Sequence, residues 1–211
     1  READVLMKGL VSTDKYMRGI LNKEYGLLPP KGVLSHVTVF ELPMYHKLLV
    51  VSDVAVIPYP DLSQKTAIVR YLTATAKVLG VERPKIAAIA PSEQLLASVQ
   101  SSVEAAVLAK MADRGQLGDV VLDGPLALDV ALFEEVARTK RLSSPVAGDA
   151  DCLLMPNLDA ANVFFKSANH LCNASLAAMV AGTKAPCVLT SRGDSAESKL
   201  YSIALAALSA K

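Results

Sequence analysis

The sequence lacks several features that would assign it to a common class at once. Its 211 residues include only 3 cysteines, too few and odd in number for a disulfide framework, so we expect a reducing compartment. Lys and Arg number 22 against 21 Asp and Glu, so no basic field attracts nucleic acid or anionic membrane. No apolar run of roughly 18 residues and no signal-peptide pattern is present. These absences predict a soluble, cytoplasmic protein.

Two further absences limit the chemistry. The chain contains neither GxGxxG after a strand-like run nor GxxxxGK[ST], so it lacks both standard nucleotide-binding loops. The three histidines are scattered, and the cysteines show no CxxC spacing. We therefore expect no metal site.

Apolar sequence, in contrast, is abundant. Hydrophobic residues make up 52% of the chain, too many for disorder, and the length suits one large domain or two small ones. Short runs that are apolar on both faces, as in strands buried between helices, alternate with longer amphipathic segments. The strand-like runs are 37–40, 48–57, 85–90, 119–123, 152–155 and 187–190, and the helix-length segments are 61–80, 98–113, 126–139, 159–172 and 195–209. This alternation predicts an α/β fold with a largely parallel sheet.

Local signals support two of these elements. Asp61 followed by Gln64 resembles a capping box, and Gly80 is placed to end the same helix. The strand-like runs on either side of residues 43–46 predict an antiparallel hairpin, which we place at the edge of the sheet.

Candidate chemistry is expected just beyond the carboxyl ends of strands. Run 187–190 is followed by Ser191, Arg192, Gly193 and Asp194 and then by a helix. Free backbone N–H groups, the helix dipole and an arginine would together make an anion site there, with Ser191 and Arg192 holding a phosphate or an oxyanion. Alternatively, Asp194 caps the helix and Glu197 completes a capping box.

Two other segments carry polar residues around predicted strands. Acids at Asp149 and Asp151 precede run 152–155, and 156–162 follows it with two asparagines and leads to Lys166. Asn157 and Asp159 are equally suited to capping the next helix. The segment 123–126 (Asp-Gly-Pro-Leu) reads as a strand end that turns into a helix. From the residues alone we infer an enzyme that handles an anionic, phosphorylated substrate.

At these segments the sequence resembles the phosphate acetyltransferase and phosphate butyryltransferase family. The resemblance lies in 123–129 (DGPLALD), 144–151 (SPVAGDAD), 156–162 (PNLDAAN) with Lys166, and the Ser191–Arg192 turn. The segments 195–202 and 34–40 resemble the butyryl branch.

The resemblance implies a fold of two α/β domains, each an αβα sandwich, separated by a cleft as in isocitrate and isopropylmalate dehydrogenases. Residues 31–182 would form the second domain, and residues 1–30 and 183–211 would be parts of the first. Because the sequence opens at Arg1 and not at methionine, we expect an N-terminal portion to be absent.

The resemblance also implies a reaction. Members of this family move an acyl group between coenzyme A and inorganic phosphate, and the coenzyme A thiolate attacks an acyl phosphate without a metal. The implied partners are acyl-CoA, phosphate and acyl phosphate, and family members commonly form dimers. The matching catalytic residues are Ser191, Arg192 and Asp194, and the implied substrate-binding residues are Ser12, Thr13, Arg18, Asn162 and Glu197.

One position departs from the acetyl branch. An aspartate proposed there as the thiol base is replaced by Ser198. Either Asp194 or Glu197 takes its place, or the thiolate forms without a dedicated base, since the pKa of a thiol is about 8.5. We prefer Asp194. Alternatives that stay open are a preference for acetyl or propionyl groups, and a module that binds acyl-CoA without turnover.

Overall fold

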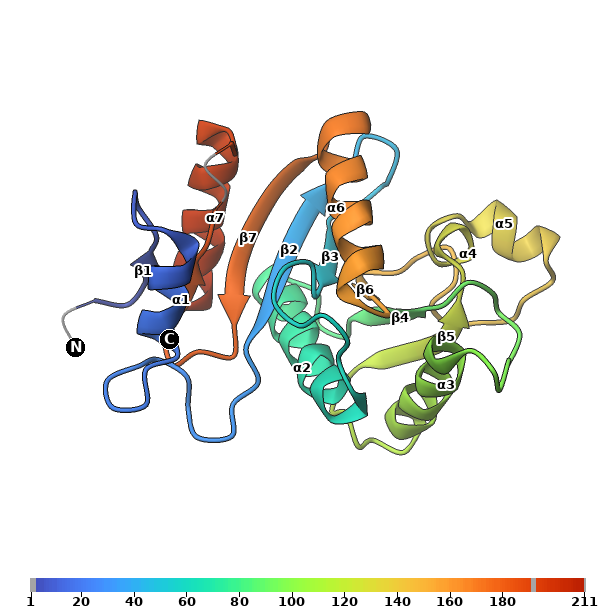
Figure 1. The fold of residues 1–211 in the computed structure, drawn as a ribbon. Coiled ribbons are helices and arrows are strands. Elements are labelled where there is room, and N and C mark those ends of the chain that lie inside the picture. Colours follow the sequence, from blue (N-terminus) through green and yellow to red (C-terminus); the bar gives the residue numbers. More distant parts are fainter. Residues whose placement is uncertain (1–2, 191–192, 211) are drawn as a thin grey trace.

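The computed structural model describes residues 3–190 and 193–210. Within this part, one mixed sheet of eight strands has the order β1-β8-β7-β2-β3-β6-β4-β5 (Figure 1). The strands are β1 (Leu6–Met7), β2 (Ser35–Glu41), β3 (Leu49–Ser52), β4 (Lys85–Ile89), β5 (Val121–Leu126), β6 (Cys152–Leu154), β7 (Ser175–Ala181) and β8 (Cys187–Val188). Strands β3, β6, β4 and β5 are mutually parallel, and β1 is parallel to β8, whereas β2 is antiparallel to both of its neighbours. The expected α/β fold with a mostly parallel sheet is confirmed.

Helices cover both faces of this sheet. They are α1 (Thr13–Ile20), α2 (Leu62–Val78), α3 (Gln100–Asp113), α4 (Leu128–Leu132), α5 (Glu134–Thr139), α6 (Leu158–Leu171) and α7 (Ala196–Ser209). Val50 and Val51 are neighbours on β3 yet belong to different clusters of core side chains, because successive residues of a strand point to opposite faces. One cluster packs against α2, α3 and α7, and the other against α4, α5 and α6. A strand covered on both faces must be apolar throughout, which is the pattern that the sequence shows.

A third, smaller cluster belongs to α1. It joins Tyr16 and Ile20 to Leu34, to Val180 of β7 and to Cys187 of β8. The sheet is continuous across the expected domain boundary, since Val180 pairs with Cys187. The division into two domains with a cleft therefore stays a prediction.

The local signals for α2 are confirmed. Asp61 accepts a hydrogen bond from Gln64 N (2.8 Å), and the Gln64 side chain accepts one from Asp61 N (2.9 Å), which completes the capping box. Gly80 follows the last turn with φ +92°, the left-handed conformation that ends many helices. The expected helix 126–139 is instead two short helices, α4 and α5, which meet at Phe133 in an extended conformation.

One expectation about the strands is wrong, and the long strand β7 was not predicted. The hairpin of β2 and β3 is antiparallel as predicted, but it lies inside the sheet, because β7 pairs with β2 and β6 pairs with β3. Strand β7 was not predicted, because its Ser-Leu-Ala-Ala-Met-Val-Ala sequence has few of the β-branched residues that mark strands. This missed strand covers the side of β2 that would otherwise have been an edge.

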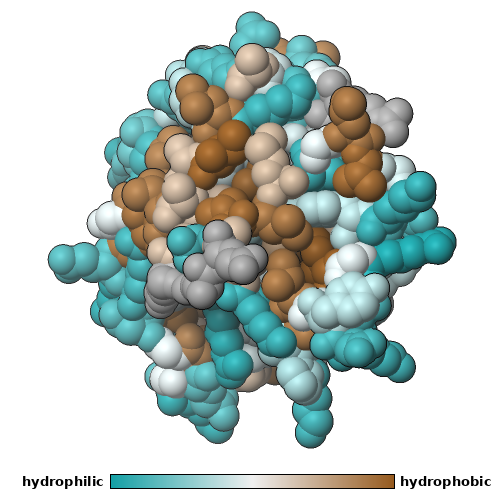
Figure 2. Space-filling view, turned by 90° about the vertical axis from the view of Figure 1, so that its left-hand side faces the viewer, coloured by the Kyte–Doolittle hydropathy of each residue, from teal (hydrophilic) through white to brown (hydrophobic). Residues whose placement is uncertain are grey.

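One side of the molecule is apolar. Figure 2 views the side of α1, β1 and α7 and shows hydrophobic residues across its centre. The exposed apolar side chains on β1 and α7 are Leu6, Met7, Leu200, Tyr201, Ile203 and Leu208. None of the helices in the described residues is long and apolar enough to cross a membrane.

Candidate active site

The carboxyl ends of β3, β6 and β4 lie in line at one edge of the sheet. Ser52 pairs with Leu154, and Ala88 pairs with the same residue from the other side. Asn157 follows β6 and caps α6, because its Oδ1 accepts a hydrogen bond from Ala160 N (2.9 Å). The capping alternative is thus confirmed for Asn157. It is wrong for Asp159, whose carboxylate accepts a hydrogen bond from the Tyr59 hydroxyl (3.1 Å).

Asn162 lies on the exposed side of α6, one turn further on. Its Nδ2 donates to the carbonyl oxygen of Val54 (3.2 Å), which fixes α6 against the loop that follows β3. That loop is organised by Asp53, which is only 3% exposed. The carboxylate of Asp53 accepts hydrogen bonds from the backbone N–H groups of Ala55 (2.8 Å), Val56 (2.9 Å) and Ile57 (3.1 Å).

Helix α1 carries three of the expected substrate-binding residues. Ser12 caps it by accepting a hydrogen bond from Lys15 N (3.3 Å), and Thr13 is its exposed first residue. The Arg18 side chain is 78% exposed and forms an ion pair with Asp14 (3.1 Å) one turn earlier. A surface pair of this kind contributes little to stability, so the Arg18 guanidinium remains accessible to an anion.

Tyr16 fixes α1 to the strands beside it. Its hydroxyl donates to the carbonyl oxygens of Leu6 (3.0 Å) and Val188 (3.1 Å), and burial raises the pKa of this phenol. Val188 is the last residue of β8, three positions before Ser191. The helix that carries Arg18 is thereby bound to the segment that leads to Ser191 and Arg192.

Ser191 and Arg192 themselves lie outside the described residues. Beyond them, Ser195 is the N-cap of α7, and its Oγ accepts a hydrogen bond from Ser198 N (3.0 Å). The alternative in which Asp194 caps this helix is therefore wrong. Glu197 is exposed and accepts a hydrogen bond from the Tyr201 hydroxyl (2.8 Å) one turn further on.

The acids before β6 do not belong to this edge, contrary to the expectation from sequence. They lie at the amino end of β6, where Lys47 Nζ contacts Asp149 (2.8 Å) and Asp151 (2.7 Å), and Lys85 Nζ contacts Asp149 (2.6 Å). Partial burial would raise the pKa of Asp149, but hydrogen bonds from Lys47, Lys85 and His46 hold that pKa well below its usual range. These acids form a structural ion cluster.

The segment 123–126 is also structural. It lies within β5, and not in a turn after a strand as expected. A Cβ at Gly124 would lie 2.8 Å from the carbonyl oxygen of Ala88 on β4, so a larger residue does not fit there. This segment therefore packs β5 closely against β4.

Apart from Asp194 and Glu197, which lie at the start of α7, the described site residues lie in two groups. Ser12, Thr13 and Arg18 lie on α1, and Asn162 lies on α6, with no hydrogen bond or ion pair between Arg18 and Asn162 among the described residues. The loop after β3 lies between the groups, since Val54 accepts the Asn162 bond and Val56 packs with Tyr16 and Leu189 in the α1 cluster.

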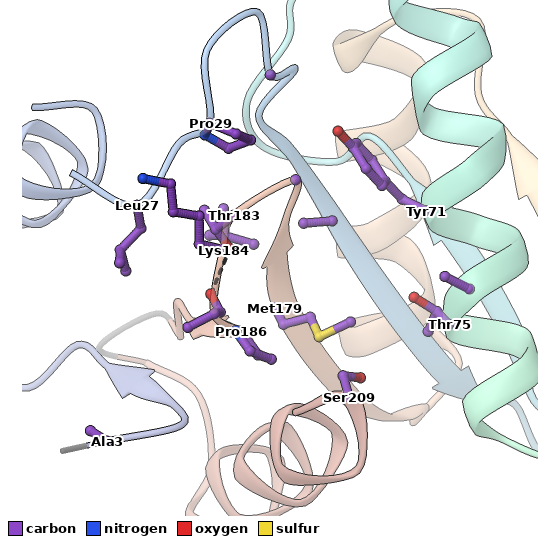
Figure 3. Close-up of a pocket in the computed structure, with 16 residues that line it drawn as sticks. Ala3, Leu27, Pro29, Tyr71, Thr75, Met179, Thr183, Lys184, Pro186 and Ser209 are labelled. Carbon is purple, nitrogen blue, oxygen red and sulfur yellow. Dashed lines mark hydrogen bonds between the residues drawn. The ribbon is translucent and has the colours of Figure 1, made fainter. Parts of the chain in front are cut away.

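The largest of the described cavities, about 820 Å³, is elsewhere (Figure 3). It lies between α2, the end of β7 and the segments around Pro29 and Lys184, and none of the expected site residues that the structure describes lines it. Its lining includes Gly32 and Thr183, next to the expected domain boundaries.

The buried polar residues beneath the loop after β3 were not predicted from the sequence. Ser35 Oγ donates to Asp53 Oδ2 (3.0 Å), and Ser52 Oγ donates to the carbonyl oxygen of His36 (2.9 Å). The sequence feature that could have indicated these residues is Ser35-His36 at the start of one strand together with Ser52-Asp53 at the end of its partner. Only the antiparallel pairing of β2 and β3 brings them together.

Comparison with known proteins places the chain in a family. The family described as phosphate acetyl/butaryl transferase matches residues 1–207. A phosphate butyryltransferase from Clostridium acetobutylicum is 47% identical over 98% of this chain and 68% of its own length, and a phosphate acetyltransferase from Thermotoga maritima is 41% identical over 98% and 70%.

A solved structure agrees with these relatives. A branched-chain phosphotransacylase from Enterococcus faecalis V583 has a TM-score of 0.89 and 35% identity, over 99% of this chain and 74% of that one. Sequence and fold lead to the same assignment over nearly the whole chain. The chain belongs to the phosphate acetyltransferase and phosphate butyryltransferase family.

Proposed function

We propose that this protein transfers a short-chain acyl group, with butyryl favoured, between coenzyme A and inorganic phosphate. Coenzyme A is then a co-substrate, and the other partners are acyl-CoA and acyl phosphate. The names of the relatives support the reaction class. The greater identity to a butyryltransferase, 47% against 41%, favours butyryl.

The structural observation that carries the proposal is the pair of hydrogen bonds from Tyr16. These bonds hold α1, which carries the accessible Arg18, against β8, the strand that precedes Ser191 and Arg192 in the sequence. Two guanidinium groups, from Arg18 and Arg192, would suit a phosphoryl dianion, because each presents a planar fork of donors. A donor set of this kind would also stabilise the oxyanion that forms at the acyl carbon.

In the proposed reaction the coenzyme A thiol loses its proton, and the thiolate attacks the carbonyl carbon of the acyl phosphate. The new C–S bond forms as the C–O bond to phosphate breaks, and inorganic phosphate leaves. Ser198 is engaged in the cap of α7, with its Oγ 3.1 Å from Ser195 Oγ. As the base we favour Asp194, with Glu197, whose carboxylate accepts the Tyr201 hydroxyl, as the alternative.

The test is phosphate-dependent release of free thiol from butyryl-CoA by the purified full-length protein. We expect Arg192→Ala and Arg18→Ala each to lower kcat/KM about 10- to 100-fold, the value of a hydrogen bond to a charged group. Arg83→Ala is a matched control, since Arg83 is exposed and pairs with Asp119 (3.4 Å) away from α1 and β8. Undiminished turnover in both test variants would overturn the assignment of the site.

The same assay decides the acyl preference. One methylene in an apolar pocket changes kcat/KM by about 10-fold or more, so acetyl-, propionyl- and butyryl-CoA separate clearly. A maximum of kcat/KM with acetyl-CoA or propionyl-CoA would support the alternative, an acyltransferase that prefers these shorter acyl groups. Tight coenzyme A binding without turnover of any of the three would favour a non-catalytic binding module.

We further propose that the protein is a cytoplasmic homodimer. The apolar side formed by β1 and α7 supports a buried interface (Figure 2), and the three cysteines are unpaired, as in a reducing compartment. Light scattering tests the dimer. We also propose that residues 1–30 with 183–211 are parts of one domain and residues 31–182 another; the α1 cluster, which joins Tyr16 and Ile20 to Leu34 and Val180, would then lie where the two meet.

A further inference from the structure

A cavity of about 520 Å³ at the carboxyl edge of the sheet has no part in the reaction described above. It lies beyond β4 and β6, where its lining includes Ile89, Ala90, Pro91, Pro156 and Asn157. The loop after β3 and the helices α2, α3 and α6 supply its other walls. Ligands of α/β proteins bind beyond the carboxyl ends of strands, and cavities of about 300–1,000 Å³ hold small molecules.

A buried ion pair lies in the wall of this cavity. Lys65 of α2 is 4% exposed, and its ammonium donates to Glu104 of α3, whose side chain is 14% exposed. A buried pair of this kind adds little stability over apolar side chains of the same size, because each charge loses its hydration. Such a pair beside a cavity therefore points to a polar ligand.

The side chains around the pair offer that ligand both a donor and an acceptor. The Lys65 ammonium has three N–H donors, and Glu104 is its one hydrogen-bond acceptor among the described residues. Gln100 Nε2 donates to the other carboxylate oxygen of Glu104 (2.9 Å). Because a carboxylate only accepts, the amide nitrogen of Gln100 faces Glu104, and Gln100 Oε1 is left to accept a bond from the ligand.

The other walls of the cavity suit a flat ring. They include Pro60, Pro91, Pro156 and Ala160, which are apolar. A nucleobase has two apolar faces and a polar edge, and proteins bind it between apolar side chains with hydrogen bonds to that edge. Adenine presents the N6 amino donor beside a ring-nitrogen acceptor, which matches an acceptor beside a donor in the protein. Guanine presents two acceptors, O6 and N7, at the same edge and does not match.

The start of α3 adds a place for a phosphate. Val99 precedes this helix and makes no side-chain cap, and the N–H groups of Gln100 and Ser101 in the first turn have no acceptor within the helix. Both Gln100 and Ser101 line the cavity. Free N–H groups and the helix dipole favour an anion at such a position, so a phosphate attached to the ribose would bind beside the base.

One loop joins this cavity to the residues expected to carry out acyl transfer. Tyr59 and Pro60, which end the loop after β3, line the cavity. Val56, three residues before Tyr59, packs in the α1 cluster with Tyr16, on the helix that carries Arg18. The arrangement suits a substrate whose reactive thiol and nucleotide are separated by a long arm, as they are in coenzyme A.

We propose that this cavity binds the adenine ring of an adenine nucleotide, between the donor of Lys65 and the acceptor of Gln100. Coenzyme A carries such a nucleotide, and the assignment of the cavity to coenzyme A rests on the proposed function. A free adenine nucleotide has the same chemistry, and competition with coenzyme A separates the two sources.

The probe is adenosine 3′,5′-bisphosphate, whose binding to the purified full-length protein is measured by titration calorimetry. We expect Gln100→Ala to weaken binding about fivefold, the effect of one hydrogen bond. Lys65→Met combined with Glu104→Leu removes both charges together, so that no unpaired charge stays buried, and should weaken binding about 10- to 100-fold. Gln116→Ala is the matched control, because Gln116 is exposed beyond the opposite end of α3.

A truncated substrate separates ligand binding from a structural role of the ion pair. Butyryl-pantetheine keeps the acyl thioester and lacks the nucleotide. If coenzyme A occupies the cavity, the double variant should lower kcat/KM for butyryl-CoA about 10- to 100-fold and leave kcat/KM for butyryl-pantetheine unchanged. An equal fall with both substrates would show a structural role and would overturn the assignment to coenzyme A.

The remaining outcomes are distinct. Loss of probe binding at saturating coenzyme A would identify coenzyme A as the occupant, and binding that persists would identify a free adenine nucleotide. No binding, equal binding by the wild-type protein and the double variant, or equally tight binding of guanosine 3′,5′-bisphosphate would overturn the proposal. If the wild-type protein binds the probe but turns over none of the acyl-CoA substrates, the proposed function fails alone.

Discussion

Removing the Tyr16 hydroxyl tests the link between α1 and β8 most directly. Tyr16→Phe keeps the ring, which is 7% exposed and packed in the α1 cluster, and deletes only the donor to Leu6 and Val188. The carbonyl oxygen of Val188 keeps its bond from Lys8 N (3.1 Å), so only part of the network is lost. We expect the free energy of unfolding to fall by about 1 kcal/mol, the usual value of one intramolecular hydrogen bond.

For a chain of this size, that loss lowers Tm by about 2–4 °C, which calorimetry resolves. At 25 °C the variant remains folded, so any loss of activity reports geometry and not unfolding. We expect kcat/KM for phosphate to fall about fivefold, because about 1 kcal/mol of the restraint on the Arg18 helix is gone. Tyr25→Phe, at a tyrosine that is 73% exposed, is the control.

Two results would refute this reasoning. If Tyr16→Phe and Tyr25→Phe have the same Tm, the hydroxyl does not stabilise the contact between α1 and β8. If Tm falls but kcat/KM does not, the contact is structural only and does not position Arg18.

Three further predictions concern other parts of the chain. Asp149→Asn should lower the unfolding free energy by about 1 kcal/mol at pH 7; because the pKa of the folded carboxyl lies below its unfolded value of about 3.9, the difference should shrink only as the pH falls below about 4. Gly182→Ala should cost about 2–5 kcal/mol, since φ is +91° and the new Cβ would lie 2.1 Å from the carbonyl oxygen of Val33. In the native protein Cys172 should react with a thiol reagent, whereas Cys187, whose thiol pKa is raised by burial, should not.

Each of these has a direct check. Chemical denaturation across pH measures the first, and a difference that grows below pH 4 would contradict it. Gly80→Ala is the control for the second, since its φ of +92° is the same but nothing lies within 4 Å, so it should cost only about 1–2 kcal/mol. For the third, Cys172→Ser should remove one fast-reacting thiol, and Cys187→Ser should remove none.

Local sequence determined much of the secondary structure. The Asp61–Gln64 box and Gly80 define α2 because capping depends on residues a few positions apart. The buried strands are recognisable because a strand covered by helices on both faces has no polar side. The motifs in 123–129, 144–151 and 156–162 also identified the family, which the comparisons confirm.

Sequence motifs did not separate structural from functional polar residues. Asp149 and Asp151 stand near the asparagines of 156–162 in the chain, yet β6 places the two groups at opposite ends of a strand. The family motifs include both groups of residues. A motif gives positions along the chain only, and it does not say at which end of a strand each residue lies in the folded protein.

Strand order and long-range hydrogen bonds were decided only by the tertiary structure. Nothing near Ser35 in the sequence indicates Asp53, and nothing near Tyr16 indicates Val188, 172 residues away. Such contacts depend on which strands pair, and β7, the strand that links β2 to β8, was not among the strands that the sequence predicted. The sequence by itself therefore determined the class of the protein and most of its helices and strands, and the packing of those elements determined which polar side chains meet.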